Sequence, residues 1–252
     1  MRIAIVGGTG TLGRHAAAEL AGRGHEIRVL SRRSPDFPVD LASGEGLAKA
    51  LVGCAAVIDA SNASSPKRAA QVLVAGSQVL LAAEQQAGVG HHVCVSIVGC
   101  ERVPMGYYKV KAQQERVVER GPVPYSIVRA TQFHELAAAA LVAAGKWHVL
   151  PIPQLKLQTI AALEVGRAVA DVAEGEPIRG RVQVAGPELL TARDLARSWK
   201  SATGRAAFLL PVPVPGKLGR ALRAGGLTTD QPDVRGTITF ADWMVAGERA
   251  AH

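Results

Sequence analysis

The sequence is poor in aromatic residues, which make up only 4% of its 252 positions. Hydrophobic residues reach 48% in total, so alanine, valine and leucine have to form most of the core. Small side chains of this kind suit helices packed closely on a parallel sheet better than an aromatic ligand cage. The length is sufficient to bury a full core, and the composition is that of an ordinary globular protein.

Cysteine is also scarce, with only Cys54, Cys94 and Cys100 in the chain. An odd number without a C-x-x-C spacing argues against a disulfide framework, so we expect buried, reduced thiols and a cytoplasmic location. The seven histidines include no H-E-x-x-H motif. The adjacent His91 and His92 are expected at the surface or in a turn before a strand, and no metal site is predicted.

Long apolar runs are missing as well. The longest, from Leu136 to Ala144, is far short of the roughly 20 residues that a membrane-spanning helix needs. Met1 and Arg2 lead straight into a strand pattern, which leaves no room for a signal peptide. We therefore expect no membrane partner.

The charge balance is basic, with 29 Lys and Arg against 21 Asp and Glu and a net charge of +8. The basic residues are scattered, and neither a zinc-finger nor an RNP motif is present, so no nucleic-acid partner is predicted. An anionic cofactor accounts for part of the excess, and a basic surface accounts for the rest.

The stretch from Gly7 to Gly13 follows an apolar, β-branched run and precedes a helical pattern. Gly8, Gly10 and Gly13 satisfy G-x-G-x-x-G, a spacing that lets the backbone turn tightly and approach a pyrophosphate. The N-terminus of the following helix faces the anion. This strand, turn and helix predict a nucleotide site, and the alternative is a glycine-rich turn that binds nothing.

Strand and helix patterns alternate without interruption over the first half of the chain. Strands are expected at 3–6, 25–30, 55–60, 93–98 and 125–130, and helices at 14–23, 44–51, 68–87 and 106–119. This alternation predicts an α/β fold with a doubly wound, Rossmann-type parallel sheet. Beyond residue 134 the pieces become short and irregular, although Thr191-x-x-Asp194 predicts a capped helix start. We predict an NAD(P)-binding domain over residues 1–133 and a small C-terminal substrate lobe over 134–252, interleaved with the sheet in one compact unit.

The second strand ends in Ser31-Arg32-Arg33 and carries no acidic residue there. An Asp or Glu at this place holds the ribose 2′-hydroxyl of NAD, whereas a guanidinium favours a 2′-phosphate. The sequence therefore predicts NADP(H) in preference to NAD(H). The alternative is that the arginines belong to a solvated loop.

Tyr107 and Lys111 stand four residues apart on a predicted helix, so their side chains emerge on one face. An ammonium beside a phenol lowers the tyrosine pKa and allows the phenol to exchange a proton with a substrate oxygen. Ser96, at the end of the preceding strand, is a candidate donor to a substrate carbonyl. A serine at a strand end is commonplace, so Ser96 alone carries little weight.

These motifs resemble those of the short-chain dehydrogenase/reductases, and within them the atypical, NmrA-like NAD(P)-binding proteins. The resemblance rests on the glycine stretch, on Asp40-Leu41, on the Tyr107 and Lys111 pair, and on the segments 125–133 and 184–187. It implies that Thr9 to Leu12 bind the pyrophosphate, Arg32 the 2′-phosphate, and Asp40 and Leu41 the adenine. It further implies that Ala60 to Asn62 pass beside the cofactor and that Thr131 to His134 lie near the nicotinamide. The full set expected to bind the cofactor is Gly7, Thr9, Gly10, Thr11, Leu12, Gly13, Arg32, Asp40, Leu41, Ala60, Ser61, Asn62 and Lys111.

The function predicted from these residues is that of an NADP(H)-dependent oxidoreductase, which reduces a carbonyl, quinone or similar unsaturated group of a small molecule. Tyr107 is expected to donate the proton, Lys111 to activate it and Ser96 to hold the carbonyl. One alternative is a non-catalytic sensor that binds NADP(H) and passes its redox state to a protein partner. Another is internal redox chemistry such as epimerisation. The oligomeric state is open, a homodimer included.

Overall fold

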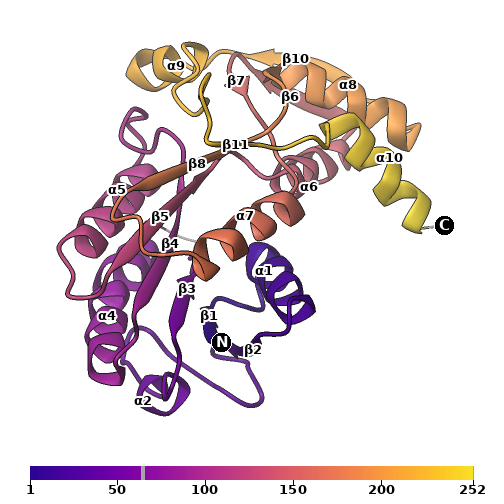
Figure 1. The fold of residues 1–252 in the computed structure, drawn as a ribbon. Helices are drawn as coiled ribbons and strands as arrows, with labels where there is room; N and C mark the ends of the chain where they lie inside the picture. The colour runs from indigo at the N-terminus through magenta and orange to yellow at the C-terminus, as the bar shows by residue number, and fades with distance from the viewer. Residues whose placement is uncertain (64–65, 252) are drawn as a thin grey trace. The chain divides into compact units, whose positions relative to one another are not determined.

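The structure is a computed structural model that describes residues 1–63 and 66–251. Its main feature is a seven-stranded sheet in the order β11-β8-β5-β4-β3-β1-β2 (Figure 1). The strands are β1 (Arg2–Val6), β2 (Glu26–Leu30), β3 (Ala56–Asp59), β4 (His91–Ile97), β5 (Tyr125–Ala130), β8 (Arg181–Ala185) and β11 (Val234–Arg235). Strand β1 pairs in parallel with both β2 and β3, and β3 pairs in parallel with β4. The predicted doubly wound, Rossmann-type sheet is confirmed.

Contacts divide the chain into two compact units, each assembled from three segments. The first unit comprises Met1–Ser96, Gly106–Arg129 and Val165–Val182, and the second comprises Ile97–Met105, Ala130–Glu164 and Gln183–His252. The chain therefore passes from one unit to the other several times, and one of these changes, after Arg129, lies close to the boundary predicted at residue 133.

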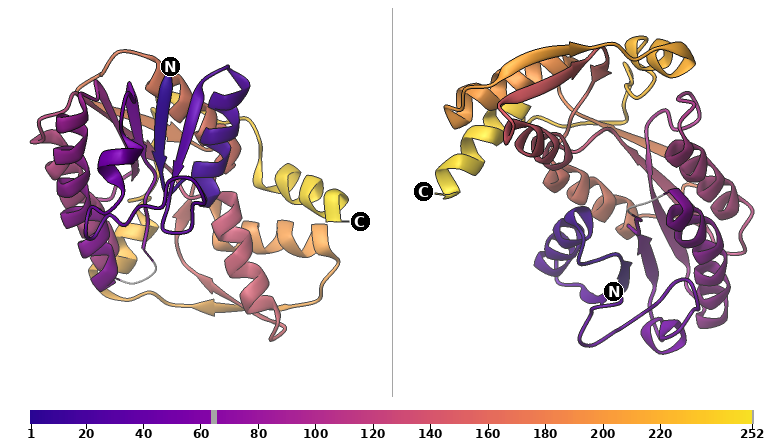
Figure 2. Two further views of the ribbon diagram at one scale, coloured as in Figure 1. Left: turned by 90° about the horizontal axis from the view of Figure 1, so that it is seen from below. Right: turned by 180° about the vertical axis from the view of Figure 1, so that it is seen from behind.

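Helices cover both faces of the sheet in the first unit. They are α1 (Thr11–Gly22), α2 (Leu47–Ala50), α3 (Pro66–Ala69), the π-helix η1 (Ala70–Ala75), α4 (Gly76–Ala87), α5 (Gly106–Glu119) and α7 (Ala162–Glu174). Figures 1 and 2 show α4 and α5 side by side on one face and α1 and α7 on the other. The core between α4, α5 and the sheet consists of aliphatic side chains such as Leu80, Val118 and Ile127, with Cys54 and Cys94 buried among them as expected. The low aromatic content is compatible with this packing because the helices lie close to the sheet.

The second unit has its own core, built around Trp199 and Phe240, which are both fully buried. Its elements are α6 (His134–Gly145), β6 (Val149–Pro153), β7 (Lys156–Leu157), β9 (Leu190–Thr191), α8 (Ala192–Thr203), β10 (Phe208–Val212), α9 (Gly216–Arg223) and α10 (Phe240–Ala251). Helix α8 begins with the predicted capping box, because Thr191 and Asp194 bond each other's backbone N–H groups. Strands β6 and β10 form a separate two-stranded parallel sheet.

The helix expected at 68–87 is present as one continuous helical run formed by α3, η1 and α4, in which the π-helical stretch η1 shifts the hydrogen-bond pattern. One expectation about local structure was wrong. His91 and His92 lie inside β4 and are buried instead of exposed. Their burial is tolerated because each ring has a buried partner: Ser126 Oγ is 2.9 Å from His91 Nε2, and the Glu84 carboxylate is 2.9 Å from His92 Nδ1.

Within the described ranges, no helix combines the length and the apolar character that crossing a bilayer requires.

Candidate functional site

The glycine stretch forms a tight turn between the end of β1 and the start of α1. Gly7 has φ +71°, and a Cβ on it would lie 2.7 Å from the carbonyl oxygen of Ala60. A Cβ on Gly13 would lie 2.3 Å from the oxygen of Gly7, so the first turn of α1 packs directly on the loop backbone. The N-cap residue, Gly10, provides no side-chain cap. The first N–H groups of α1 are thus available to an anion.

This turn lies at the point where the strand order of the sheet reverses. Strand β1 has β2 on one side and β3 on the other, and in open α/β sheets such a reversal leaves a crevice at the carboxyl ends of the strands. Ser61 follows β3 at the same edge and is buried. Its Oγ has no hydrogen-bond partner among the described residues. A buried hydroxyl of this kind is a polar group that a bound ligand can satisfy.

The residues expected to bind the adenosine end lie after β2. Arg32 is exposed in the turn that follows this strand, with its guanidinium accessible to a ligand. Asp40 Oδ1 accepts a hydrogen bond from the N–H of Ala42 at 2.9 Å, and the side chain of Leu41 is buried. Of these three residues, only Arg32 brings an exposed positive charge to this part of the sheet.

Tyr107 reaches the loop after β3 from the first turn of α5. Its hydroxyl donates to Asn62 Oδ1 at 2.8 Å, so two of the predicted residues are in direct contact. Burial raises the pKa of Tyr107 to about 12, the neighbouring Tyr108 adds to the rise, and the bond to Asn62 opposes it. The phenol is consequently protonated at neutral pH. The pKa of Tyr107 is thus raised, whereas the spacing between Tyr107 and Lys111 predicts that it is lowered.

Lys111 is almost completely buried, and its ammonium is directed to other partners than Tyr107. Nζ donates to the carbonyl oxygen of Val95 and to Gln114 Oε1, both at 2.9 Å. An ammonium has three N–H donors. With two of them used inside the described part of the chain, one is left for a ligand hydroxyl.

A buried polar chain continues from Lys111 to β3. Gln114 Nε2 donates to Asp59 Oδ2 at 3.0 Å and to Ser77 Oγ at 3.1 Å. Asp59 Oδ1 in turn accepts from the N–H of Ser61 at 3.0 Å. Asp59 and Gln114 were missed from the sequence, although an acid at the last position of a strand and a glutamine three residues after Lys111 on one helix face were available signals.

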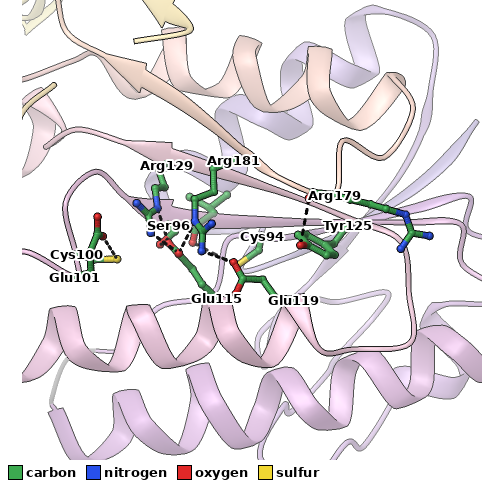
Figure 3. A network of polar contacts seen from close by, with 11 residues as sticks. Cys94, Ser96, Cys100, Glu101, Glu115, Glu119, Tyr125, Arg129, Arg179 and Arg181 are labelled. Carbon is green, nitrogen blue, oxygen red and sulfur yellow. Dashed lines mark hydrogen bonds and ion pairs between the residues drawn. The ribbon is translucent and has the colours of Figure 1, made fainter. Parts of the chain in front are cut away.

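Ser96 belongs to a different network, which Figure 3 shows in detail. Its buried hydroxyl donates to the Glu115 carboxylate at 2.5 Å. The same carboxylate accepts from Arg129 at 2.6 Å and from Arg181 at 3.2 Å. Burial raises the pKa of Glu115, but the hydrogen bonds from Arg129 and Ser96 outweigh it and hold the pKa below its usual range. The hydroxyl of Ser96 is thus bound to a carboxylate on α5.

The segment from Thr131 to His134 belongs to the second unit. Thr131 Oγ1 accepts from the N–H of Gly186 at 3.1 Å. His134 Nε2 lies 3.0 Å from the carbonyl oxygen of Ile238, and its ring packs edge-on against Phe240. Burial lowers the pKa of His134, so the ring is neutral at physiological pH.

A glycine turn under an uncapped helix N-terminus, at the reversal point of a parallel sheet, defines a dinucleotide-binding protein of the Rossmann class. The residues fit such a ligand, since the backbone approach at Gly7 and Gly13 excludes any side chain and the Ser61 hydroxyl lacks a partner. Residues 7–174 match the model of a family described as NAD(P)H-binding. The chain belongs to this NAD(P)H-binding family, as its motifs predicted.

The comparisons with individual proteins agree with this family. The chain is 30% identical to the photosystem II assembly factor Ycf39 of Trieres chinensis over 151 residues, which are 54% of this chain and 47% of that protein. It thus spans about half the length of this relative. The structure of NADPH-dependent quinone oxidoreductase QOR2 of Escherichia coli, complexed with NADPH, matches with a TM-score of 0.81 and 18% identity, over 97% of this chain and 99% of that one.

A second solved structure matches over the whole chain. It is a short-chain dehydrogenase/reductase superfamily protein of Agrobacterium tumefaciens with bound NAD, which has a TM-score of 0.77 and 17% identity over 100% of this chain and 98% of that one. At such identities the likeness shows the fold alone, which this chain shares with that superfamily member. The resemblance found in the motifs is confirmed at this level.

Proposed function

We propose that the protein is an NADP(H)-dependent oxidoreductase, which reduces a carbonyl, quinone or similar unsaturated group of a small molecule. The observation that carries the proposal is the contact of Tyr107 with Asn62, which puts a protonated phenol at the end of β3. The ends of β1 and β3 share one edge of the sheet with the glycine turn. A proton donor and a dinucleotide site therefore meet at the same edge.

Each residue has a defined task in this proposal. The first N–H groups of α1 bind the pyrophosphate, and the remaining donor of Lys111 binds a ribose hydroxyl. The dinucleotide, when bound, supplies the hydride. The hydroxyl of Tyr107 exchanges Asn62 for the substrate oxygen and gives it a proton. A pKa of about 12 keeps that proton in place until substrate arrives.

The preference for NADP(H) rests on Arg32. The exposed guanidinium follows β2, where an acidic residue would repel a 2′-phosphate. The fold neighbours include proteins with NAD and with NADPH bound, so the residue after β2 carries the preference.

A second function, binding of NADP(H) without turnover as a redox sensor, is supported by a specific observation. Lys111 and Ser96 donate to Val95, Gln114 and Glu115, and neither is bonded to Tyr107. A sensor needs the dinucleotide site but no assembled donor set. The relative from Trieres chinensis is named an assembly factor, a name that refers to assembly and not to a reaction.

The test is titration of NADPH and NADH into the purified protein, followed by nicotinamide oxidation with a panel of quinones, aldehydes and ketones. The reductase proposal expects turnover that falls at least about 100-fold in Tyr107→Phe, with NADPH affinity retained. Tyr108→Phe is the matched control on the same helix and should keep its turnover. Tight NADPH binding with no turnover on the whole panel would favour the sensor, and failure to bind either dinucleotide would overturn both functions.

A further inference from the structure

The two-stranded sheet of β6 and β10 has one face that is entirely apolar and turned away from its own core. The register pairs Val149 with Phe208, Pro151 with Leu210 and Pro153 with Val212. Side chains two residues apart share a face, so these six lie together. We call them the outer ribbon face. The alternate residues, which are Leu150, Ile152 and Leu209, pack into the core around Trp199.

The outer ribbon face is accessible and is extended by an exposed tryptophan. Phe208 is 66% exposed and Leu210 45%, while Trp147, just before β6, is 82% exposed. The turn that presents Trp147 is fixed, because its N–H donates to Ala144 and His148 adopts a left-handed φ of 55°. The N–H of Phe208 donates to the carbonyl oxygen of His148 at 2.8 Å. Because Trp147 directly precedes His148, this bond holds the backbones of the two exposed aromatic residues close together.

The two stretches of chain that contain this face carry charge of one sign only. No Asp or Glu occurs in residues 136–163 or 195–229. The same two stretches contain eight basic residues, Lys146, Lys156, Arg197, Lys200, Arg205, Lys217, Arg220 and Arg223. Lys146 is next to Trp147, Arg205 stands three residues before Phe208, and both are exposed. In the view of Figure 1 the basic helix α9 follows β10 at the same end of this unit.

We propose that the outer ribbon face, with Trp147, docks on the surface of a lipid bilayer that contains anionic lipids. Exposed Trp and Phe side chains settle at the boundary between headgroups and acyl chains. Lys and Arg beside them are attracted by the negative surface potential, and the two stretches that contain the face add no acidic residue that would oppose this attraction. Large apolar side chains that are exposed together on one face are typical of an interaction surface.

The charge pattern favours a bilayer over a protein partner. Both stretches provide cations and no acid, and cations of one sign complement the uniformly negative surface of a bilayer with anionic lipids. Peripheral docking of this type needs no spanning helix. The expectation of no membrane partner was drawn from the shortness of the apolar runs, and that argument covers spanning segments only.

The proposal can be separated from cofactor binding by the choice of variants. Every residue of the outer ribbon face belongs to the second unit, whereas the glycine turn, Arg32 and Tyr107 belong to the first. Since Trp147 and Phe208 are exposed, replacing them leaves both cores intact. NADPH affinity then serves as an internal measure that each variant is folded.

The experiment is co-sedimentation of the full chain with vesicles of phosphatidylcholine mixed with phosphatidylglycerol, and with vesicles of phosphatidylcholine alone. We expect binding to the mixed vesicles only, weakened when salt is raised from about 0.1 M to about 1 M because the screening length falls to about 3 Å. The double variant Trp147→Ser with Phe208→Ser should lower the partition coefficient at least about tenfold. Lys146→Ser with Arg205→Ser should lower it by about fivefold for each charge.

Matched controls come from exposed residues elsewhere in the described chain. Ile178→Ser removes an apolar side chain of 51% exposure, and Lys49→Ser with Arg120→Ser removes two exposed charges. These controls should bind the mixed vesicles like the parent chain. Absence of binding to the mixed vesicles, or equal loss in the controls, would overturn the proposal. So would a dimer in solution that the Trp147 and Phe208 double variant dissociates, since the face would then be a protein interface.

Discussion

Gln114 connects Lys111 to the buried carboxylate of Asp59, accepting from Nζ of the lysine at 2.9 Å and donating to Asp59 at 3.0 Å. The anion thereby orients the amide so that its oxygen faces the ammonium. The position of Lys111, which the proposed function uses to bind the cofactor, thus depends on a residue of β3 as well as on its own helix.

The first prediction concerns this bridge. Gln114→Leu removes one hydrogen bond from Lys111, which keeps Val95, and one from Asp59, which keeps Ser61 and Ser77. Because both lost bonds are to buried charged groups, the free energy of unfolding should fall by about 2 to 3 kcal/mol. The NADPH affinity should fall as well, because Lys111 loses its orientation. Gln113→Leu, at an exposed position of the same helix, is the control for the change in helix composition. Urea unfolding and NADPH titration measure both effects, and equal stability of the two variants would contradict the prediction.

A second prediction compares two glycines of α1. Gly13→Ala places a methyl group 2.3 Å from the oxygen of Gly7, so the helix has to move away from the turn and NADPH binding should be lost. Gly22→Ala meets no atom within 4 Å and should stabilise the helix by up to about 1 kcal/mol, because alanine is the better helix former. Calorimetric titration with NADPH separates the two variants. Binding by Gly13→Ala with the affinity of the parent would show that the close approach is not required.

The third prediction tests the choice of cofactor. Arg32→Ala removes the exposed guanidinium after β2, and the affinity for NADPH should fall about 10- to 100-fold, the value of a charge-assisted hydrogen bond. The affinity for NADH should change little, because NADH has no 2′-phosphate. Arg33→Ala is the neighbouring control, expected to keep the preference. A parallel loss of both affinities in Arg32→Ala would argue against a contact with the 2′-phosphate.

The buried pair of Glu84 and His92 leads to a prediction about pH. Burial lowers the pKa of His92, but the Glu84 carboxylate at 2.9 Å outweighs it and holds this pKa well above its usual value. Burial also raises the pKa of Glu84. Both directions mean that the folded chain holds protons more tightly than the unfolded chain. For His92 the stabilisation is therefore fully present below about pH 6.5, the ordinary histidine value, and is lost as the pH rises through the pKa of the folded state. For Glu84 the corresponding loss begins at a lower pH, above the ordinary carboxyl value of about 4.3.

Urea unfolding between about pH 6 and about pH 9 measures this slope. The parent chain should lose about 1.4 kcal/mol for each unit by which the pKa of His92 is raised. Glu84→Gln should lower stability by about 3 kcal/mol at the acidic end and flatten the profile. Glu45→Gln, at an exposed site, should leave the profile unchanged, and a flat profile for the parent would contradict the prediction.

The features that the sequence alone predicted correctly are local ones. The glycine turn, the helix after it and the capping box at Thr191 depend on residues within a few positions of each other, so their patterns are legible in the sequence. The alternation of strands and helices was likewise enough for the fold class.

What could not be predicted depends on partners far away in the chain. His92 on β4 has its buried partner, Glu84, on α4, and Ser96 donates to Glu115, which is 19 residues further on. The orientation of Lys111 follows from Gln114, whose own partner, Asp59, is 55 residues earlier. Spacing along one helix places Lys111 on a face, but the neighbouring strands decide where its ammonium points.

The three buried cysteines make local opening of the structure measurable by chemical labelling. Burial raises the pKa of Cys54 and Cys94, so the thiols are protonated and unreactive while the structure is closed. Alkylation by a thiol reagent then requires local opening, and its rate measures how often the surrounding segment opens. Two of the positions lie in the first unit and Cys100 lies in the second. Mass spectrometry of the alkylated peptides can thus time the opening of each unit separately in the unmodified protein.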